Sequence, residues 1–209
     1  MTTLADLKTR IVTETQRDDL SGDLAAQLLN AIQKACRYYQ NEKFWFNSII
    51  TTAATVAGTA TVNVPSTMLR VDRVTIPAQY TELLEATLAD LSYETVQSIP
   101  RAYAYYNDAL KLYPVPDAVY TLELTGLADV AAPAVDADTS IWTNEAADLI
   151  VARAKMTLYR DQFRDPEGVQ FAQADVQEVF AALKRETAKR LETKLRPRVA
   201  RRGYNINYE

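Results

Sequence analysis

The chain has 209 residues, 48% of them hydrophobic and 24% charged, with a formal net charge of -4 at pH 7. This length and composition allow a buried core and exclude a disordered chain. No run approaches the ~18 apolar residues that a membrane span requires, and the first residues lack a basic region followed by an apolar stretch, so we expect no membrane segment and no cleaved signal.

Histidine is absent and Cys36 is the one cysteine. Without histidine, Ser-His-Asp and Cys-His catalysis are impossible and the commonest zinc ligand is missing. Cys36 shares an apolar helix face with Ile32 and Tyr39, which predicts a buried, inert thiol. A hydrolase built on Asp136 and Asp138 is the remaining enzymatic alternative, but neighbouring acids in an Ala-rich loop are usually solvated. We therefore expect no enzyme activity, no cofactor and no metal.

Charge is divided unevenly along the chain. Residues 184–209 carry nine Lys or Arg and three Glu, a balance of +6, whereas residues 1–183 carry 14 bases and 24 acids, a balance of -10. A basic tail on an acidic body suits a tail that reaches an acidic surface, either nucleic acid or a neighbouring subunit.

Two helices are predicted before residue 44. The first begins at the cap Thr3, with Asp6 completing a weak capping box, and fades near Arg17. A turn over 18–23 follows, with Asp19 or Ser21 as the cap of the second helix. Their apolar stripes predict an antiparallel helix pair; the stripes are Leu4, Leu7 and Ile11, and Leu24, Leu28, Ile32, Ala35 and Tyr39.

Residues 34–47 mark the point where the helical pattern ends and a strand pattern begins. Three consecutive aromatic residues, Phe44, Trp45 and Phe46, lie at this exit. Because aromatic side chains bring a large area into a core, we interpret them, together with Trp142, as a structural junction that packs one part of the chain on the other. A role in contacting a partner is the alternative.

The next eighty residues are predicted to form short strands. Alternating patterns indicate strands over 49–53, 59–64, 69–76 and 119–127, and a short helix is expected over 87–97. The strongest local signal is a hairpin of 102–106 and 109–113 around the two-residue turn Asn107-Asp108, since both residues tolerate positive φ. The tyrosines of this region could stack nucleic-acid bases, but a basic groove is missing and cross-strand packing is the better interpretation.

A helical pattern returns after the loop 129–143. Asn144 is the expected helix cap, with Trp142 stapling the helix start onto the body, and this helix extends to about Phe163. Asp165-Pro166 opens a last helix whose apolar line runs for about thirty residues, is broken by Thr187 and ends at Pro197. A helix of that length spans ~45 Å, more than a single-domain core requires, so part of it is expected to project or to contact another chain.

The C-terminal arm, residues 196–209, is too polar to fold alone, and a solvated, disordered tail is its default interpretation. The interspersed aromatic and apolar residues also fit a segment that becomes ordered as an added strand on a partner. The residues of the arm expected to bind a neighbouring chain are Arg196, Arg198, Arg201, Arg202, Tyr204, Ile206 and Tyr208.

These patterns predict a mainly α chain with a β-rich insertion, an α+β fold. We expect a helical bundle made from residues 1–47 and 144–195, a small antiparallel sheet inserted over 48–128, a loop over 129–143 and an extended basic arm over 196–209.

The chain resembles the head-to-tail adaptor, or connector, proteins of tailed bacteriophages, in particular the podovirus-like type. The resemblance covers about 150 residues and none of its motifs is catalytic. The motifs are Thr3 to Ile11, the Phe44-Trp45-Phe46-Asn47 corner, the segment Leu110 to Asp117, and the helix start from Ile141-Trp142 to Ile150.

The resemblance implies a homo-oligomeric ring of twelve subunits below the portal protein, in the neck of a virion assembled in the host cytoplasm. It implies that the arms grip the portal, that the insertion faces outward or toward tail or nozzle proteins, and that the genome passes through the lumen without specific binding. No membrane is involved. The alternative function is a nucleic-acid-binding module that uses the basic C-terminal tail, although the acidic body and the lack of a reading helix count against it.

Overall fold

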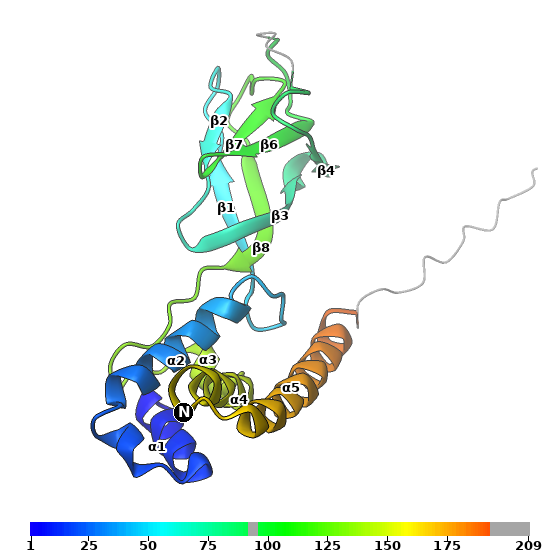
Figure 1. The fold of residues 1–209 in the computed structure, drawn as a ribbon. Helices are drawn as coiled ribbons and strands as arrows, with labels where there is room; N and C mark the ends of the chain where they lie inside the picture. Colours follow the sequence, from blue (N-terminus) through cyan, green and yellow to red (C-terminus); the bar gives the residue numbers. More distant parts are fainter. Residues whose placement is uncertain (92–95, 193–209) are drawn as a thin grey trace, which may run out of the picture.

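A computed structural model describes residues 1–91 and 96–192. The fold is α+β, as predicted, and Figure 1 shows it as two units: the helices gather at one end of the molecule and the strands at the other. Each unit has its own hydrophobic core.

The helical unit is organised around its fourth helix, α4 (Ala147–Leu158), which packs against α1, α2 and α5. The sequence predicts that the two N-terminal helices pair with each other. In the structure α4 contacts both of them. The other helices are α1 (Leu4–Thr15), α2 (Ala25–Tyr39), α3 (Ile141–Asn144) and α5 (Pro166–Glu192), with a 3-10 turn at Asp18–Ser21 and a π-helical turn at Tyr159–Phe163.

The first helix begins as the sequence predicts. Thr3 Oγ1 accepts from the amide of Asp6, and the Asp6 carboxylate accepts from the amide of Thr3, which completes the capping box. The predicted cap of α2 is wrong: Asp19 and Ser21 lie in the 3-10 turn, and α2 starts after Leu24, which caps it with no side-chain hydrogen bond. The tighter turn therefore takes the residues that would otherwise begin the helix.

The predicted cap Asn144 is also wrong. Ser140 caps α3 in a capping box with Thr143, and Asn144 is the last residue of that short helix. The Asn144 side chain instead accepts a hydrogen bond from the amide of Thr2 at 2.9 Å, which ties the N-terminus to α3. Trp142 lies inside α3 and is fully buried.

The helix α5 has 27 described residues and is therefore about 40 Å long. Asp165 caps it as predicted, since its Oδ1 accepts from the amides of Glu167 and Gly168 at 3.1 Å each. Thr187, the polar residue on its apolar line, is buried and bonds within the helix to the carbonyl of Leu183.

The strands form two four-stranded sheets in the described residues, whereas the sequence predicts a single small antiparallel sheet. One has the order β1-β8-β3-β4 and the other β2-β7-β6-β5, in which β5 and β6 are parallel. The strands are β1 (Ser48–Ala54), β2 (Thr61–Asn63), β3 (Met68–Ile76), β4 (Thr81–Glu82), β5 (Leu84–Glu85), β6 (Ala102–Tyr106), β7 (Ala109–Tyr113) and β8 (Thr121–Ala128).

The predicted hairpin is confirmed by the pairing of β6 with β7. Asn107 and Asp108 have φ values of 50° and 56°, the left-handed conformation that a tight hairpin turn of type I′ needs at both positions. The helix predicted over 87–97 is wrong where the structure describes it: residues 88–90 form a turn, with the amide of Asp90 bonded to Thr87 Oγ1. The amide of Asp90 also donates to the carbonyl of Thr87, so local hydrogen bonds close a turn there, and Leu91 is buried directly after it.

A close backbone approach joins β8 to β3. A Cβ atom at Gly126 would lie 1.9 Å from the carbonyl oxygen of Arg70, so no larger residue fits at Gly126 without a backbone shift. The β3–β8 register shifts between Met68 and Arg70 and between Val71 and Arg73, which places this contact in an irregular part of the ladder.

Candidate interaction site at the aromatic junction

The chain passes from the helical unit to the sheets through a compact aromatic cluster, here called the junction: residues 39–47 with Trp142. Phe44 is fully buried and stacks on Phe46, their ring centroids 5.0 Å apart. Phe46 meets the edge of Trp142 at 5.7 Å and Trp45 at 5.0 Å. The four aromatic residues predicted as a structural junction therefore lie together.

Asn47 holds the turn that carries these rings. It is 1% exposed; its Oδ1 accepts from the amide of Phe44 and its Nδ2 donates to the carbonyl of Glu42, both at 2.8 Å. Ser48 Oγ donates to the carbonyl of Phe44 at 3.0 Å. Because buried polar groups are costly when unpaired, this network specifies one conformation for the chain between α2 and β1.

The C-terminal half of α5 is fastened to the junction. Phe180 stacks on Tyr39 at 5.7 Å and meets Phe44 edge-on at 6.2 Å. One turn later, Lys184 Nζ lies over the Phe44 ring at 5.0 Å and donates to the Glu42 carboxylate at 2.7 Å.

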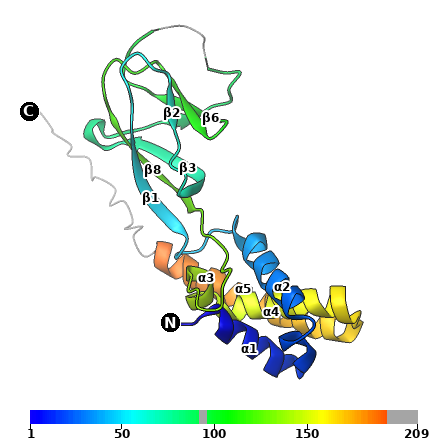
Figure 2. The ribbon, with the colours of Figure 1, turned by 90° about the vertical axis from the view of Figure 1, so that its left-hand side faces the viewer.

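A second cation extends this contact toward the end of the described chain. The guanidinium of Arg190 lies 4.4 Å from the centre of the Trp45 ring, a cation–π contact. Figures 1 and 2 show that the described end of α5, in orange, is the end of that helix nearer the sheets. The junction therefore contacts α5 to within two residues of Glu192, the last described residue.

Ion pairs join the junction to the sheets. Lys43 Nζ lies 2.9 Å from Asp72 on β3, and Arg70 Nε lies 2.8 Å from the same carboxylate. Burial raises the pKa of Asp72, but the hydrogen bonds from Lys43 and Arg70 outweigh it and the pKa is lowered overall. On the other connection, the amide of Ala128 donates to the carbonyl of Asn47 at 2.8 Å. The junction thus contacts α2, α5 and the β1-β8-β3-β4 sheet.

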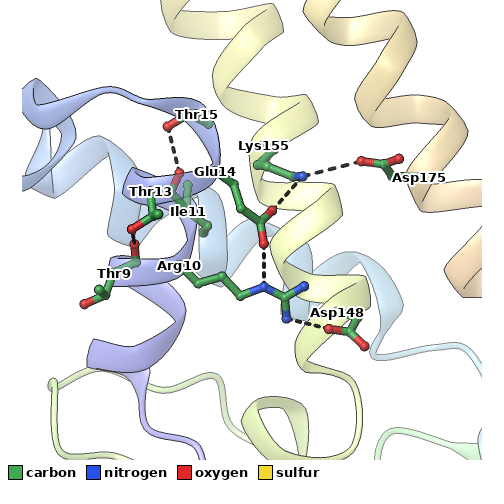
Figure 3. Close-up of polar contacts among 9 residues, drawn as sticks. All are labelled: Thr9, Arg10, Ile11, Thr13, Glu14, Thr15, Asp148, Lys155 and Asp175. Carbon is green, nitrogen blue, oxygen red and sulfur yellow. Dashed lines mark hydrogen bonds and ion pairs between the residues drawn. The ribbon is translucent and has the colours of Figure 1, made fainter.

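A second polar cluster ties α1, α4 and α5 together (Figure 3). Lys155 on α4 lies 2.8 Å from Glu14 and 3.4 Å from Asp175, and Arg10 bridges Glu14 and Asp148. Burial raises the pKa of Glu14, but its hydrogen bonds to Lys155 and Arg10 lower it overall. These ion pairs are partly shielded and link three helices, so they contribute more than isolated surface pairs.

The binding residues predicted in the C-terminal arm cannot be located in the structure. Arg196, Arg198, Arg201, Arg202, Tyr204, Ile206 and Tyr208 all lie outside the described residues. Sequence reasoning missed three residues that the structure brings to the junction: Phe180, Lys184 and Arg190. The spacing of Phe180, Lys184 and Thr187 places them on one face of α5, and this spacing was the one sequence signal that could have indicated a contact surface. Nothing in the sequence shows that this face contacts residues about 140 positions earlier.

Two kinds of catalytic centre, a reactive thiolate and a metal site, are absent from the described residues. Burial raises the pKa of the Cys36 thiol to about 12, so it is not a thiolate nucleophile at neutral pH. In residues 1–91 and 96–192, no three His, Cys, Asp or Glu side chains gather as a metal site would require. Within the same ranges, no helix is both long and apolar enough to cross a bilayer.

Comparison with known proteins agrees with this description. The family model described as "SU10 adaptor protein" matches residues 2–202, which is nearly the whole chain. A search of curated proteins finds no match.

Proposed function

Since the chain belongs to the SU10 adaptor protein family, a family of bacteriophage adaptors, we propose that it forms a ring of about twelve copies that joins the portal to the tail. The ring lies in the neck of the virion, after assembly in the host cytoplasm, and the genome passes through its lumen. The observation that carries this proposal is the family match across both structural units and the first half of the arm.

The attachment of α5 to the junction supports a role for the arm in portal binding. The junction holds α5 through Lys184 and Arg190, and the arm begins six residues after Arg190 in the sequence. A rigid base lowers the entropy lost when an attached segment docks. We propose that the arginines and aromatic residues of the arm bind the portal by charge pairing and by adding a strand to its surface.

The sheets supply a second contact surface. Large apolar side chains are unusually exposed there: Tyr80 is fully exposed, and Leu84, Val119 and Tyr106 are 73%, 69% and 62% exposed. Exposed apolar residues that gather on one unit favour a protein partner. We propose that tail or nozzle proteins bind this unit.

The acidic body suits the proposed lumen. Residues 1–183 have a balance of -10, and like charge discourages contacts to phosphate, so DNA can slide without being retained.

Deletion of residues 196–209 tests the proposal. The truncated protein should fold with an unchanged far-UV circular dichroism spectrum and unfolding midpoint, and it should no longer co-sediment with purified portal rings. Light scattering of the full chain mixed with portal should give the mass of a portal ring carrying about twelve adaptor copies. Undiminished co-assembly of the truncated protein would refute the role of the arm.

The full chain and the truncated protein also test the alternative, in which the arm binds nucleic acid. Affinity of the full chain for duplex DNA that falls steeply with salt, together with portal binding that survives the deletion, would assign the arm to DNA instead. The adaptor proposal expects the opposite pattern, with portal binding lost and DNA affinity weak at physiological salt.

A further inference from the structure

Two surfaces of opposite charge flank α4 in the helical unit. The first, the basic groove, lies between α2 and the end of α4 and is lined by Lys34 and Arg37 with a single carboxylate, Asp161. Arg153 of α4 lies over the ring of Tyr38, next to Arg37 in α2. The second, the acidic face, lies among α1, α4 and α5 and carries four carboxylates, with Arg10 and Lys155 between them; the carboxylates are Glu14, Asp148, Asp175 and Glu178.

The basic groove is a hollow of about 200 Å³ whose charges are only partly satisfied. Lys34 is 66% exposed and lies 3.7 Å from Asp161, while exposed Arg37 forms no ion pair with any described residue. The buried Oε1 atom of Gln27, which also lines the hollow, has no hydrogen-bond partner in the described chain. A buried acceptor without a donor favours a surface that a further polar group completes.

The acidic face has spare negative charge. Figure 3 shows that Arg10 and Lys155 are engaged with Glu14, Asp148 and Asp175. Glu178, one turn after Asp175, is exposed and forms no ion pair within the described ranges. Asp148 and Asp175 remain 66% and 55% exposed despite their partners.

The two surfaces lie on opposite sides of α4. Asp148, Ala152 and Lys155 line the acidic face, whereas Arg153 and Thr157 lie toward α2 and the basic groove. At 3.6 residues per turn, the side chains at 155 and 157 point about 160° apart around the helix. One copy therefore cannot bring its own two surfaces together.

We propose that the acidic face of one copy docks in the basic groove of the next, so that copies associate head to tail. The proposal rests on the ring proposed above and names the surfaces that build it. Complementary patches on opposite sides of one subunit give a heterologous contact, which generates a closed ring when its rotation closes. Arg37 and Glu178, each without an ion pair in the described chain, are the pair expected to meet.

Charge reversal at each surface gives a strict test. By sedimentation velocity, Arg37→Glu and Glu178→Arg should each weaken self-association of the full chain by about tenfold or more, because each places like charges in contact. Mixed in equal amounts, the two variants should associate as the wild type does. At one contact the introduced Glu at position 37 meets the introduced Arg at position 178, and at the other contact the native Arg37 and Glu178 meet. Arg101→Glu, at an exposed arginine of the sheet unit, is the matched control and should have no effect.

Disulfide trapping covers the case in which association is transient. The double variant Arg37→Cys/Glu178→Cys, oxidised at high concentration, should give intermolecular 37–178 links well above those of Arg101→Cys/Glu178→Cys. Equal linking of the two pairs, or reversals that leave self-association unchanged, would overturn the proposed surfaces while leaving portal binding intact. If the wild type does not bind the portal but the 37–178 links still form specifically, the proposed adaptor function is overturned while the two surfaces stand.

Discussion

Replacement of Phe44 by alanine should remove the centre of the junction. Phe44 is fully buried, and truncating a buried Phe to Ala typically costs about 3 to 5 kcal/mol. The stacked contact with Phe46 and the edge contact with Phe180 are lost as well, and such pairs add about 0.5 to 1.5 kcal/mol beyond burial. We therefore expect a loss near the upper end of the range for buried Phe, about 4 to 5 kcal/mol in the free energy of unfolding.

Urea denaturation followed by tryptophan fluorescence is the assay. Trp45 and Trp142, the two tryptophans of the chain, both lie at the junction, so the signal reports on this region. Phe171→Ala is the matched control, since Phe171 is 75% exposed and its removal should change stability by less than about 0.5 kcal/mol. If Phe44→Ala prevents folding, Phe44→Leu should still fold and lose about 1 kcal/mol. Equal losses at positions 44 and 171 would refute the packing argument.

Three further predictions concern the two units. The pKa of Glu14 is lowered from its ordinary value of 4.5, so the ionised side chain stabilises the fold above that pH and this stabilisation is lost as pH falls through the folded-state pKa. Glu14→Gln should therefore lose less stability on acidification than the wild type, as measured by thermal unfolding across pH. Gly126→Ala should cost about 1 to 3 kcal/mol or more, because its Cβ meets the Arg70 carbonyl; an unchanged urea midpoint would contradict this. Asp165→Ala should cost about 1 kcal/mol by uncapping α5, whereas Asp165→Asn should retain most of it in the same assay.

Local chemistry accounts for the elements that could be predicted. The hairpin at Asn107-Asp108 and the helix start at Asp165-Pro166 are decided by residues within a few positions of each other, so the sequence is sufficient for both. The same holds for the capping box of Thr3 and Asp6. The cap prediction at Asn144 was wrong because Ser140, four residues earlier, forms a capping box with Thr143 and starts the short helix α3 there.

Long-range pairing accounts for what could not be predicted. The split into two sheets depends on β2 pairing with β7 and on β1 pairing with β8, about 50 and 75 residues apart, and alternation within a strand does not specify its partner. The four aromatic residues of the junction could be found from their sequence, but the cations that cover two of them come from α5. The surfaces on the two sides of α4 likewise combine residues from separate helices.

The chain enters the sheet unit and returns from it at adjacent points, so the sheet unit can be removed by protein engineering. Ser48 and Leu127 are paired across β1 and β8, and the amide of Ala128 bonds to the carbonyl of Asn47. Paired positions on antiparallel strands are close enough for a two-residue turn to connect them. A shortened gene could therefore replace residues 49–126 with such a turn and yield the helical unit alone, and modules with equally close ends could be grafted in its place.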